Sequence, residues 1–334
     1  MRARQIIHTI DSHTAGEGTR LVISGIPVKG RTILEKLAYL RENLDWMRSA
    51  LMNEPRGFRG MFGGVLVPPS DDSTDYGVIW MDNGGYLNMS GASSIGVGVT
   101  LVEVGLVPVT EPLTRIRLEV PAGVIEVDVT VKDGRALSAA VRNVPAFLYA
   151  RDLLIDVEGY GKVPVDISFG GNFFGVVKAE DLGLEVRPEL AGELAKVGVA
   201  LRHAINRETK VVHPVRSHIA SVDLVTIYGL PTVAGAKYKC THVFADGQFD
   251  RSPGGTGTSH MMALLLARDQ MQPDEEIVAE GILGSIFHGR IVGREKVGEF
   301  DGVIPEIRSD AYITGFHQFV VDPDDPFAEG FLVG

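Results

Sequence analysis

The stretch Asn88-Met89-Ser90-Gly91-Ala92-Ser93-Ser94-Ile95-Gly96 opens directly into the apolar run 97–106. A second loop of the same design, Asp250-Arg251-Ser252-Pro253-Gly254-Gly255-Thr256-Gly257-Thr258, opens into the run 259–267. A glycine-rich loop that enters a helix leaves the N–H groups of the first turn without partners, with the positive end of the helix dipole behind them. Such a helix start binds anions. Two of them in one chain predict two similar halves that face one small anionic ligand across a cleft.

Composition narrows the class of protein. The 334 residues carry a net charge of −11, which argues against a general partner of nucleic acid or of an anionic membrane surface. No apolar run approaches the roughly 18 residues that span a bilayer. The single cysteine, Cys240, excludes an intrachain disulfide framework and a cysteine-built zinc site, so we expect a cytoplasmic protein.

Hydrophobic periodicity predicts many short strands and a few helices. Apolar residues recur every three or four positions over 32–52, which predicts one amphipathic helix that stops at Asn53 and Pro55. A second surface helix is expected over 188–207. The alternating segments predict strands, and these are 20–25, 64–67, 77–81, 115–120, 222–228 and 241–245. The segments 123–131 and 139–144 are expected to form a hairpin across Asp133-Gly134.

These elements predict an α+β fold of two lobes, each a mainly antiparallel sheet around a central apolar helix. Residues 1–120 with 307–334 would form the first lobe, and 121–306 the second. The crossings are expected near residues 120 and 306, with the ligand cleft between the lobes.

The order of several motifs resembles the proline racemase superfamily. The opening Ile10-Asp11-Ser12-His13-Thr14-Ala15-Gly16-Glu17 with Arg20 carries this resemblance. Further segments follow in the family's order: Pro55-Arg56-Gly57, Met61-Phe62-Gly63, Ser168-Phe169-Gly170-Gly171-Asn172-Phe173, Asp250-Arg251-Ser252-Pro253 and Asp322-Pro323-Asp324-Asp325-Pro326-Phe327. The segments 52–57 and 244–248 are most similar to the trans-3-hydroxy-L-proline dehydratase branch. The resemblance implies two pseudo-symmetric lobes of the diaminopimelate-epimerase type, no cofactor and no metal, and it allows a homodimer.

The resemblance also implies where the catalytic residues lie. The family's two-base enzymes place a cysteine at the start of each central helix, where the dipole favours a thiolate. Those positions hold Ser90 and Gly254 here. The dehydratase branch keeps the first cysteine only, so Gly254 favours chemistry on one face of Cα. Three other polar positions of the family have become Ala92, Phe58 and Gly60.

The expected ligand is the carboxylate of a proline-type imino acid. The main-chain N–H groups assigned to it are those of Gly91, Ala92, Ser93, Gly255 and Thr256. Asp250 matches the family position that contacts the substrate amine, and Phe62 matches the pocket wall. Ser90 is a weak base without a partner, because an alkoxide is scarcely populated at neutral pH. Ser90 could instead cap the helix or bind the amine or a water molecule.

Other polar residues have weaker claims. His260, in the first turns of the second helix, is either a replacement acid or base or a histidine of the core or rim. His13 is expected to make structural hydrogen bonds. His213, His218 and His242 show no ligand spacing. Cys240 is expected to be buried and inert.

Three functions follow. The favoured one is dehydration of trans-3-hydroxy-L-proline by abstraction of the Cα proton from one face. The second is a proline racemase or hydroxyproline 2-epimerase, which the residues at 90 and 254 disfavour. The third is an imino-acid binding protein without catalysis.

Overall fold

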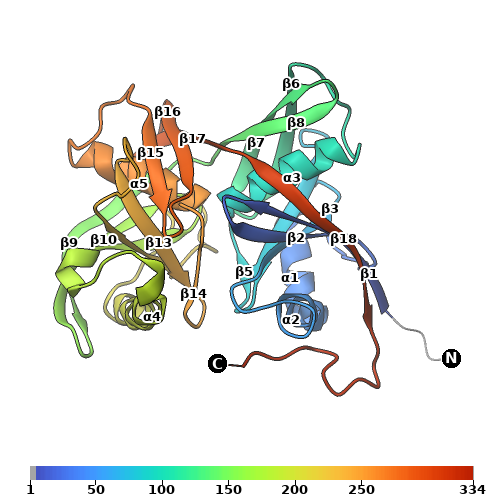
Figure 1. The fold of residues 1–334 in the computed structure, drawn as a ribbon, viewed down its shortest axis with the longest axis horizontal. Helices are drawn as coiled ribbons and strands as arrows, with labels where there is room; N and C mark the ends of the chain where they lie inside the picture. Colours follow the sequence, from blue (N-terminus) through green and yellow to red (C-terminus); the bar gives the residue numbers. More distant parts are fainter. Residues whose placement is uncertain (1–4, 334) are drawn as a thin grey trace. The chain divides into compact units, whose positions relative to one another are not determined.

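The computed structural model describes residues 5–333 and divides into two compact units (Figure 1). Unit 1 comprises Met1–Asn88, Ser93–Ala139 and Asp310–Gly334, and unit 2 comprises Met89–Ala92 and Ala140–Ser309. Unit 1 runs beyond the boundary expected near residue 120. The reason is that β7 (Gly123–Lys132) pairs with β6 (Leu113–Val120) along its length and so belongs to the same sheet.

The sheet of unit 1 follows the order β18-β1-β2-β3-β4-β6-β7. Its remaining strands are β1 (Gln5–Thr14), β2 (Glu17–Ser24), β3 (Phe62–Val67), β4 (Tyr76–Asp82), β5 (Tyr86–Leu87) and β18 (Ala311–Val321). Only the pairs β2–β3 and β4–β6 among these are parallel. A parallel pair needs a crossover connection, and helices fill both of these connections.

The sheet of unit 2 repeats that plan in the order β9-β10-β11-β12-β13-β15-β16-β17. Its strands are β9 (Phe147–Val157), β10 (Gly161–Phe169), β11 (Phe173–Lys178), β12 (Val222–Gly229), β13 (Tyr238–Phe244), β14 (Gln248–Phe249), β15 (Ile277–Gly281), β16 (Ile286–Val297) and β17 (Phe300–Ser309). The parallel pairs β11–β12 and β13–β15 correspond to β2–β3 and β4–β6. Each unit therefore has the same alternation of hairpins and crossovers, as two similar halves require.

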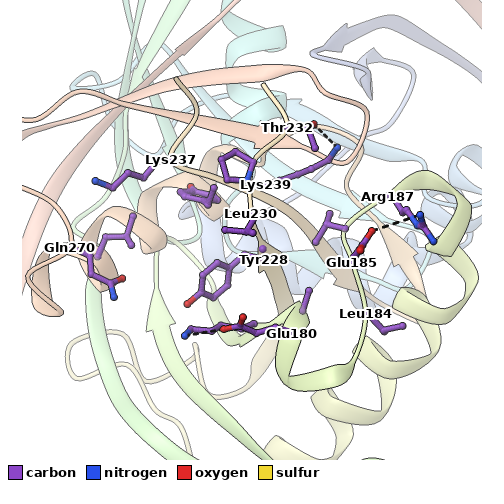
Figure 2. A pocket seen from close by; sticks show the side chains of 17 residues that line it. Glu180, Leu184, Glu185, Arg187, Tyr228, Leu230, Thr232, Lys237, Lys239 and Gln270 are labelled. Atoms are coloured by element: carbon purple, nitrogen blue, oxygen red, sulfur yellow. Dashed lines mark hydrogen bonds and ion pairs between the residues drawn. The ribbon is translucent and has the colours of Figure 1, made fainter. Parts of the chain in front are cut away.

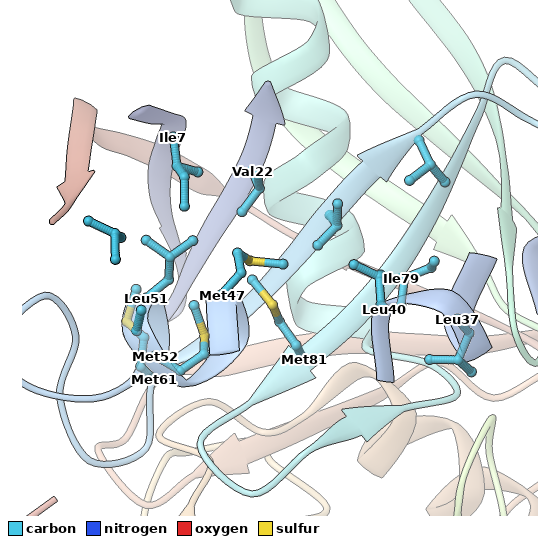
Figure 3. Packing of buried hydrophobic residues seen from close by; sticks show 14 of the residues in the cluster. Ile7, Val22, Leu37, Leu40, Met47, Leu51, Met52, Met61, Ile79 and Met81 are labelled. Carbon is cyan, nitrogen blue, oxygen red and sulfur yellow. The ribbon is translucent and has the colours of Figure 1, made fainter. Parts of the chain in front are cut away.

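The first crossover of each unit carries surface helices. In unit 2 these are the short 3-10 helix η2 (Pro188–Leu190) and α4 (Ala191–Glu208), close to the helix expected over 188–207. In unit 1 the single helix expected over 32–52 is two helices, α1 (Ile33–Asn43) and α2 (Asp45–Met52). The break lies at Leu44, whose φ of −133° is not helical. Side chains of both helices enter one apolar core (Figure 3).

The ends of these helices follow from their sequence. Thr32 caps α1, because its hydroxyl accepts the Glu35 N–H and the Glu35 carboxylate accepts the Thr32 N–H. Asp45 begins α2 and holds Arg48 through two hydrogen bonds of 2.7 and 2.8 Å. Asn53 ends α2, as expected. Local polar contacts therefore divide a continuous apolar stripe into two helices.

The second crossover of each unit leads to a buried helix. These are α3 (Gly91–Glu103), labelled in unit 1 of Figure 1, and α5 (Gly255–Ala267) in unit 2. Every residue of α5 from Gly255 to Leu265 is buried, and it contacts β9, β10, β16 and β17. Small residues at the start of each helix permit close contacts of the backbone, and large apolar residues fill the later turns.

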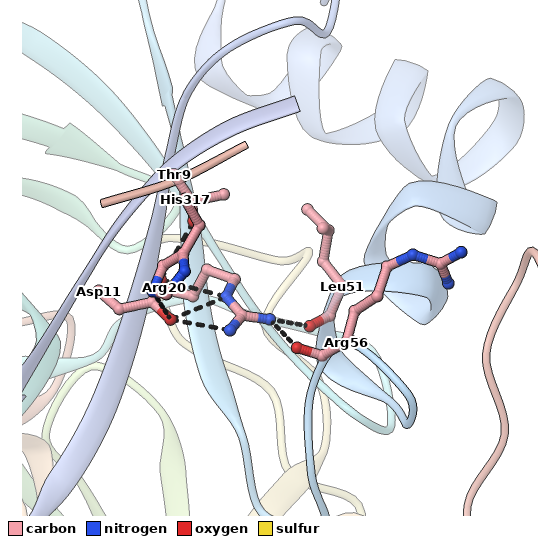
Figure 4. A network of polar contacts seen from close by, with 6 residues as sticks. All are labelled: Thr9, Asp11, Arg20, Leu51, Arg56 and His317. Atoms are coloured by element: carbon pink, nitrogen blue, oxygen red, sulfur yellow. Dashed lines mark hydrogen bonds and ion pairs between the residues drawn. The ribbon is translucent and has the colours of Figure 1, made fainter. Parts of the chain in front are cut away.

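A buried ion pair joins three of the sequence motifs of unit 1 (Figure 4). The Arg20 guanidinium donates to both carboxylate oxygens of Asp11, at 2.8–3.1 Å, and to the carbonyls of Leu51 and Arg56. The Arg56 side chain in turn pairs with Asp325 at 3.2 Å. Arg20 and Asp11 are only 6% and 8% exposed. One network of hydrogen bonds and ion pairs therefore joins the segments 10–17, 55–57 and 322–327.

We expect Arg20→Met to destabilise the protein by about 3–5 kcal/mol, because it leaves the Asp11 carboxylate buried without its cation. Urea unfolding measures this cost. Arg115→Met is the matched control: Arg115 pairs with Asp128 at 2.7 Å, but its side chain is half exposed, so its loss should cost about 1 kcal/mol or less. Equal costs for the two variants would contradict this assignment.

Candidate functional site

The starts of α3 and α5 touch through their backbones. Residues 89–92 belong to unit 2, where a Cβ on Gly91 would lie 2.6 Å from the Gly255 Cα and 2.8 Å from the Thr256 nitrogen. The reverse holds for Gly255, whose Cβ would lie 2.5 Å from the Gly91 Cα. Only glycine permits this approach at both positions. Two sets of first-turn N–H groups and two positive helix ends therefore lie next to each other.

The motif 168–173 holds both helix starts. The Asn172 side-chain amide donates to the Met89 carbonyl at 2.7 Å, just before Ser90. The Ser168 hydroxyl donates to the His260 carbonyl of α5 at 3.1 Å. All four residues are buried. This segment of unit 2 thus positions the residues before α3 and the second turn of α5 relative to each other.

The loop before α5 is fixed by a short relay of hydrogen bonds. One Asp250 carboxylate oxygen accepts the Ser252 N–H at 2.8 Å and its hydroxyl at 2.7 Å. The Ser252 hydroxyl oxygen accepts the Gly254 N–H at 3.0 Å. Gly254 then has φ 71° and ψ 124°, a conformation that favours glycine. Asp250 therefore shapes this loop in addition to any contact with a ligand.

His242 of β13 lies against Gly254. A Cβ on Gly254 would lie 2.5 Å from both Nε2 and Cδ2 of this imidazole, and 3.2 Å from an Asp250 carboxylate oxygen. A Cβ on Gly257, one helical turn later, would collide with the same ring. His242 is 1% exposed. Because the two glycines have no side chains, they leave the space that the imidazole occupies.

Hydrogen bonds fix the tautomer of His242. The Pro253 carbonyl can only accept, so Nε2 of His242 donates to it at 2.8 Å. Nδ1 then accepts the Thr226 hydroxyl proton at 2.9 Å, and the Thr226 oxygen accepts from Nε2 of His260 at 2.8 Å. Within residues 5–333, Nδ1 of His260 has no hydrogen-bond partner. A directed chain therefore runs from His260 through Thr226 and His242 to the loop before α5.

Burial keeps the imidazoles of His242 and His260 neutral. Desolvation lowers the pKa of His242, although Asp250 and the bond to Pro253 act in the other direction. Desolvation, together with His242, places the pKa of His260 well below its usual range. Burial raises the pKa of the nearby Cys240 thiol well above its usual range. Cys240 is thus buried and mainly a thiol at neutral pH, as an inert cysteine would be.

The structure also places the other residues predicted for the site. Ser90 directly precedes α3 and is 8% exposed, and Ala92 is 4% exposed. Ser93 belongs to unit 1, where its hydroxyl accepts from Thr19 at 2.9 Å. Phe62, also in unit 1, begins β3 and is 5% exposed. The roles of all four in ligand binding stay predictions.

The remaining histidines have structural surroundings. His260 stacks on Phe174 at 4.2 Å in the core of unit 2. His13 accepts the Gly16 N–H at 3.4 Å. His213 packs among phenylalanine rings and accepts two main-chain N–H groups at Nδ1. Among residues 5–333, no three His, Cys, Asp or Glu side chains lie close enough together to hold a metal ion.

Sequence reasoning missed two residues of this site. The sequence patterns place His242 only among histidines without ligand spacing, and Thr226 only within a strand. Both act through contacts between β12, β13 and α5, which depend on how these three elements pack. The only sequence signal was the pair Gly254 and Gly257, whose spacing of one helical turn marks a surface that something large approaches.

A separate cavity of about 680 Å³ lies in unit 2, around Tyr228 and Leu230 (Figure 2). Its cations face carboxylates, in the pairs Lys178–Glu180, Arg187–Glu185, Lys237–Glu275 and Lys239–Glu280 at 2.8–3.7 Å. Internal pairing leaves these cations little attraction for an anion. The start of α3 and α5 is therefore the better candidate for an anion site.

In the part of the chain described, no helix is both long and apolar enough to cross a membrane.

Comparisons with known proteins identify the family of the chain. The sequence model of the Proline racemase family matches residues 9–332. The chain belongs to the proline racemase family. It is 48% identical over 334 residues to the proline racemase of Clostridioides difficile, with 100% of both chains covered. It is 41% identical over 337 residues to the 4-hydroxyproline 2-epimerase of Cereibacter sphaeroides, again with 100% of both covered.

A solved structure extends the comparison to the fold. The hydroxyproline epimerase from Agrobacterium vitis, with bound trans-4-hydroxy-L-proline, matches with a TM-score of 0.94 at 31% identity. The match covers 100% of this chain and 96% of that one. The expected α+β fold of the proline racemase type is confirmed. These relatives carry isomerase names, so they do not support the expected preference for a lyase, and the dehydratase branch stays a prediction.

Proposed function

We propose that this member of the proline racemase family binds the carboxylate of a proline-type imino acid at the start of α3 and α5. The backbone contact between Gly91 and Gly255 carries this proposal, because it brings two sets of N–H donors together. Removal of the Cα proton moves negative charge onto the carboxylate, and preorganised N–H donors stabilise that charge. The ligand of the Agrobacterium vitis relative supports the same class of substrate.

We further propose that the chemistry is one-sided. Racemisation takes a proton from one face of Cα and returns it to the other, so each face needs an acid or base. The resemblance assigns these roles to positions 90 and 254, and Gly254 has no side chain to supply one. In the favoured reaction, the Cα proton of trans-3-hydroxy-L-proline passes to Ser90 as the base. The 3-hydroxyl takes a proton from solvent water and departs as water, and the electron pair of the broken Cα–H bond forms the C=C bond. The resulting double bond tautomerises to a cyclic imine.

A second candidate is racemisation or 2-epimerisation, which the names of the relatives favour. It requires another acid on the side of Gly254. An Asp250 carboxylate oxygen lies 3.2 Å from the position that a Cβ on Gly254 would take. Asp250 is therefore the residue that this alternative requires.

Proton NMR in D2O separates these reactions. The wild-type protein is incubated with L-proline, trans-4-hydroxy-L-proline and trans-3-hydroxy-L-proline. Formation of imine from the 3-hydroxy compound alone supports dehydration. Rapid inversion at Cα of either other compound would contradict one-sided chemistry. Binding without exchange would show an imino-acid binding protein.

We expect Ser90→Cys to raise the rate of Cα proton removal by roughly 100-fold, because a thiolate at a helix start is populated near neutral pH and an alkoxide is not. Ser90→Ala should abolish the parent rate. Exchange of the Cα proton in D2O measures both. An inactive Ser90→Cys protein that still binds L-proline would contradict a catalytic role for position 90.

A further inference from the structure

Position 254 and His242 compete for one volume. The imidazole of His242 lies where a Cβ on Gly254 would begin, with two ring atoms 2.5 Å from that point. It also lies against Gly257, so the ring cannot turn away on that side. His242 is held at both nitrogens, by Thr226 and by the Pro253 carbonyl. The ring is buried and hydrogen-bonded at both nitrogens, so its displacement by a new side chain costs considerable free energy.

We propose that His242 is the specificity-determining residue of this site, since its imidazole takes the space that a side chain at position 254 requires. This inference rests on the one-sided chemistry proposed above and names its structural cause. His242 acts as a positioning residue through its bond to Pro253, which adjoins Gly254 at the start of α5. The size of the side chain at position 242 therefore limits the size of the side chains that positions 254 and 257 can carry.

A single substitution is not expected to restore a side chain at position 254 without strain. A cysteine there meets the His242 ring and must also adopt the φ of 71°. Replacing His242 by serine removes the ring and releases the Pro253 carbonyl, so the loop can relax. The two substitutions are therefore expected to be strongly non-additive.

The test is a double-variant cycle of wild type, Gly254→Cys, His242→Ser and the two combined. Gly183→Cys is the control for positive φ, because Gly183 has φ 66° and its Cβ would meet nothing within 4 Å. We expect Gly254→Cys to lower Tm more than Gly183→Cys does. The Tm of the combined variant should lie about 3 °C or more above the value obtained by adding the Tm changes of the two single variants to the wild-type Tm.

A second measurement follows the new thiol. Its alkylation by iodoacetamide as a function of pH should be fast in the combined variant, because a thiol at a helix start has a lowered pKa. It should be slow in Gly254→Cys alone, and His242→Ser gives the background from Cys240. Additive changes in Tm, or equal alkylation of residue 254 with and without His242, would overturn the proposal.

Both readouts are independent of turnover. If Gly254→Cys does not fold, Gly254→Ala carries the same cycle with only the Cβ added. A non-additive cycle in a protein that binds no imino acid would support the His242 inference while contradicting the proposed function. An additive cycle in a protein that binds L-proline would do the reverse.

Discussion

Gly91→Ala is expected to destabilise the protein by about 3 kcal/mol and to weaken binding of L-proline by at least roughly tenfold. The added Cβ would lie 2.6–2.8 Å from three backbone atoms of Gly255 and Thr256, so the two helix starts must separate. The N–H donors proposed for the carboxylate move with them. Urea unfolding gives the first quantity and calorimetric titration gives the second.

The control for this substitution is Gly192→Ala in α4. Gly192 is also helical, but a Cβ there would meet nothing within 4 Å. Alanine favours a helix over glycine by up to about 1 kcal/mol, so this variant should be slightly more stable than wild type. Two glycine-to-alanine changes in helices should thus have opposite signs. If Gly91→Ala is also stabilising, the close contact between the helix starts is wrong.

The sequence patterns predicted part of the secondary structure and named no strand over β9–β11 or β15–β18. Alternation and three- to four-residue spacing located several strands and the surface helices, because those patterns reflect which side of an element is buried. The helix over 32–52 also differs from the expectation. Its apolar stripe continues past Leu44, and only Asp45 with Arg48 reveals the new start. A periodic pattern reports burial but not a change in helix direction.

The candidate site was predicted in part for the same reason. Glycine-rich helix starts have a local signature, so residues 90–92 and 254–256 could be proposed from the sequence. The close contact between the two starts depends on how strands of distant sequence bring them together. His242 and Thr226 act through pairing of β12 with β13, which no local pattern encodes. The branch of the family could not be decided from short motifs either.

The second large effect is a loss of folding stability at acidic pH. We expect the free energy of unfolding to fall by at least about 1.4 kcal/mol between pH 7.5 and pH 5.5, because three buried histidines are neutral in the folded protein. They are His213, whose pKa burial lowers to about 4, and His242 and His260, whose pKa values burial also lowers. Urea unfolding at pH 7.5, 6.5 and 5.5 measures the fall.

The sign follows from proton linkage. In the unfolded chain each of these histidines takes up a proton as the pH falls through about 6.5, whereas in the folded protein it does not until a lower pH. Stability is therefore fully present above pH 6.5 and is lost below it, by about 1.4 kcal/mol at pH 5.5 for His213, whose pKa in the folded protein is about 4. His242 and His260 add to the loss in the same direction. Carboxylates with lowered pKa values, such as Asp45, add a further loss at lower pH.

Substitution assigns the acid effect to particular rings. His213→Asn keeps an acceptor for the Val215 and Arg216 N–H groups, which lie 3.1 and 3.0 Å from Nδ1. It should reduce the fall between pH 7.5 and pH 5.5 by about 1.4 kcal/mol. His203→Asn, at an exposed position of α4, controls for the loss of a histidine. A wild-type stability that stays level over this range would mean that all three histidines accept protons in the folded protein as readily as in the unfolded chain. The hydrogen bonds from Thr226 to Nδ1 and from Nε2 to Pro253 argue against that, because together they leave His242 no free nitrogen to protonate.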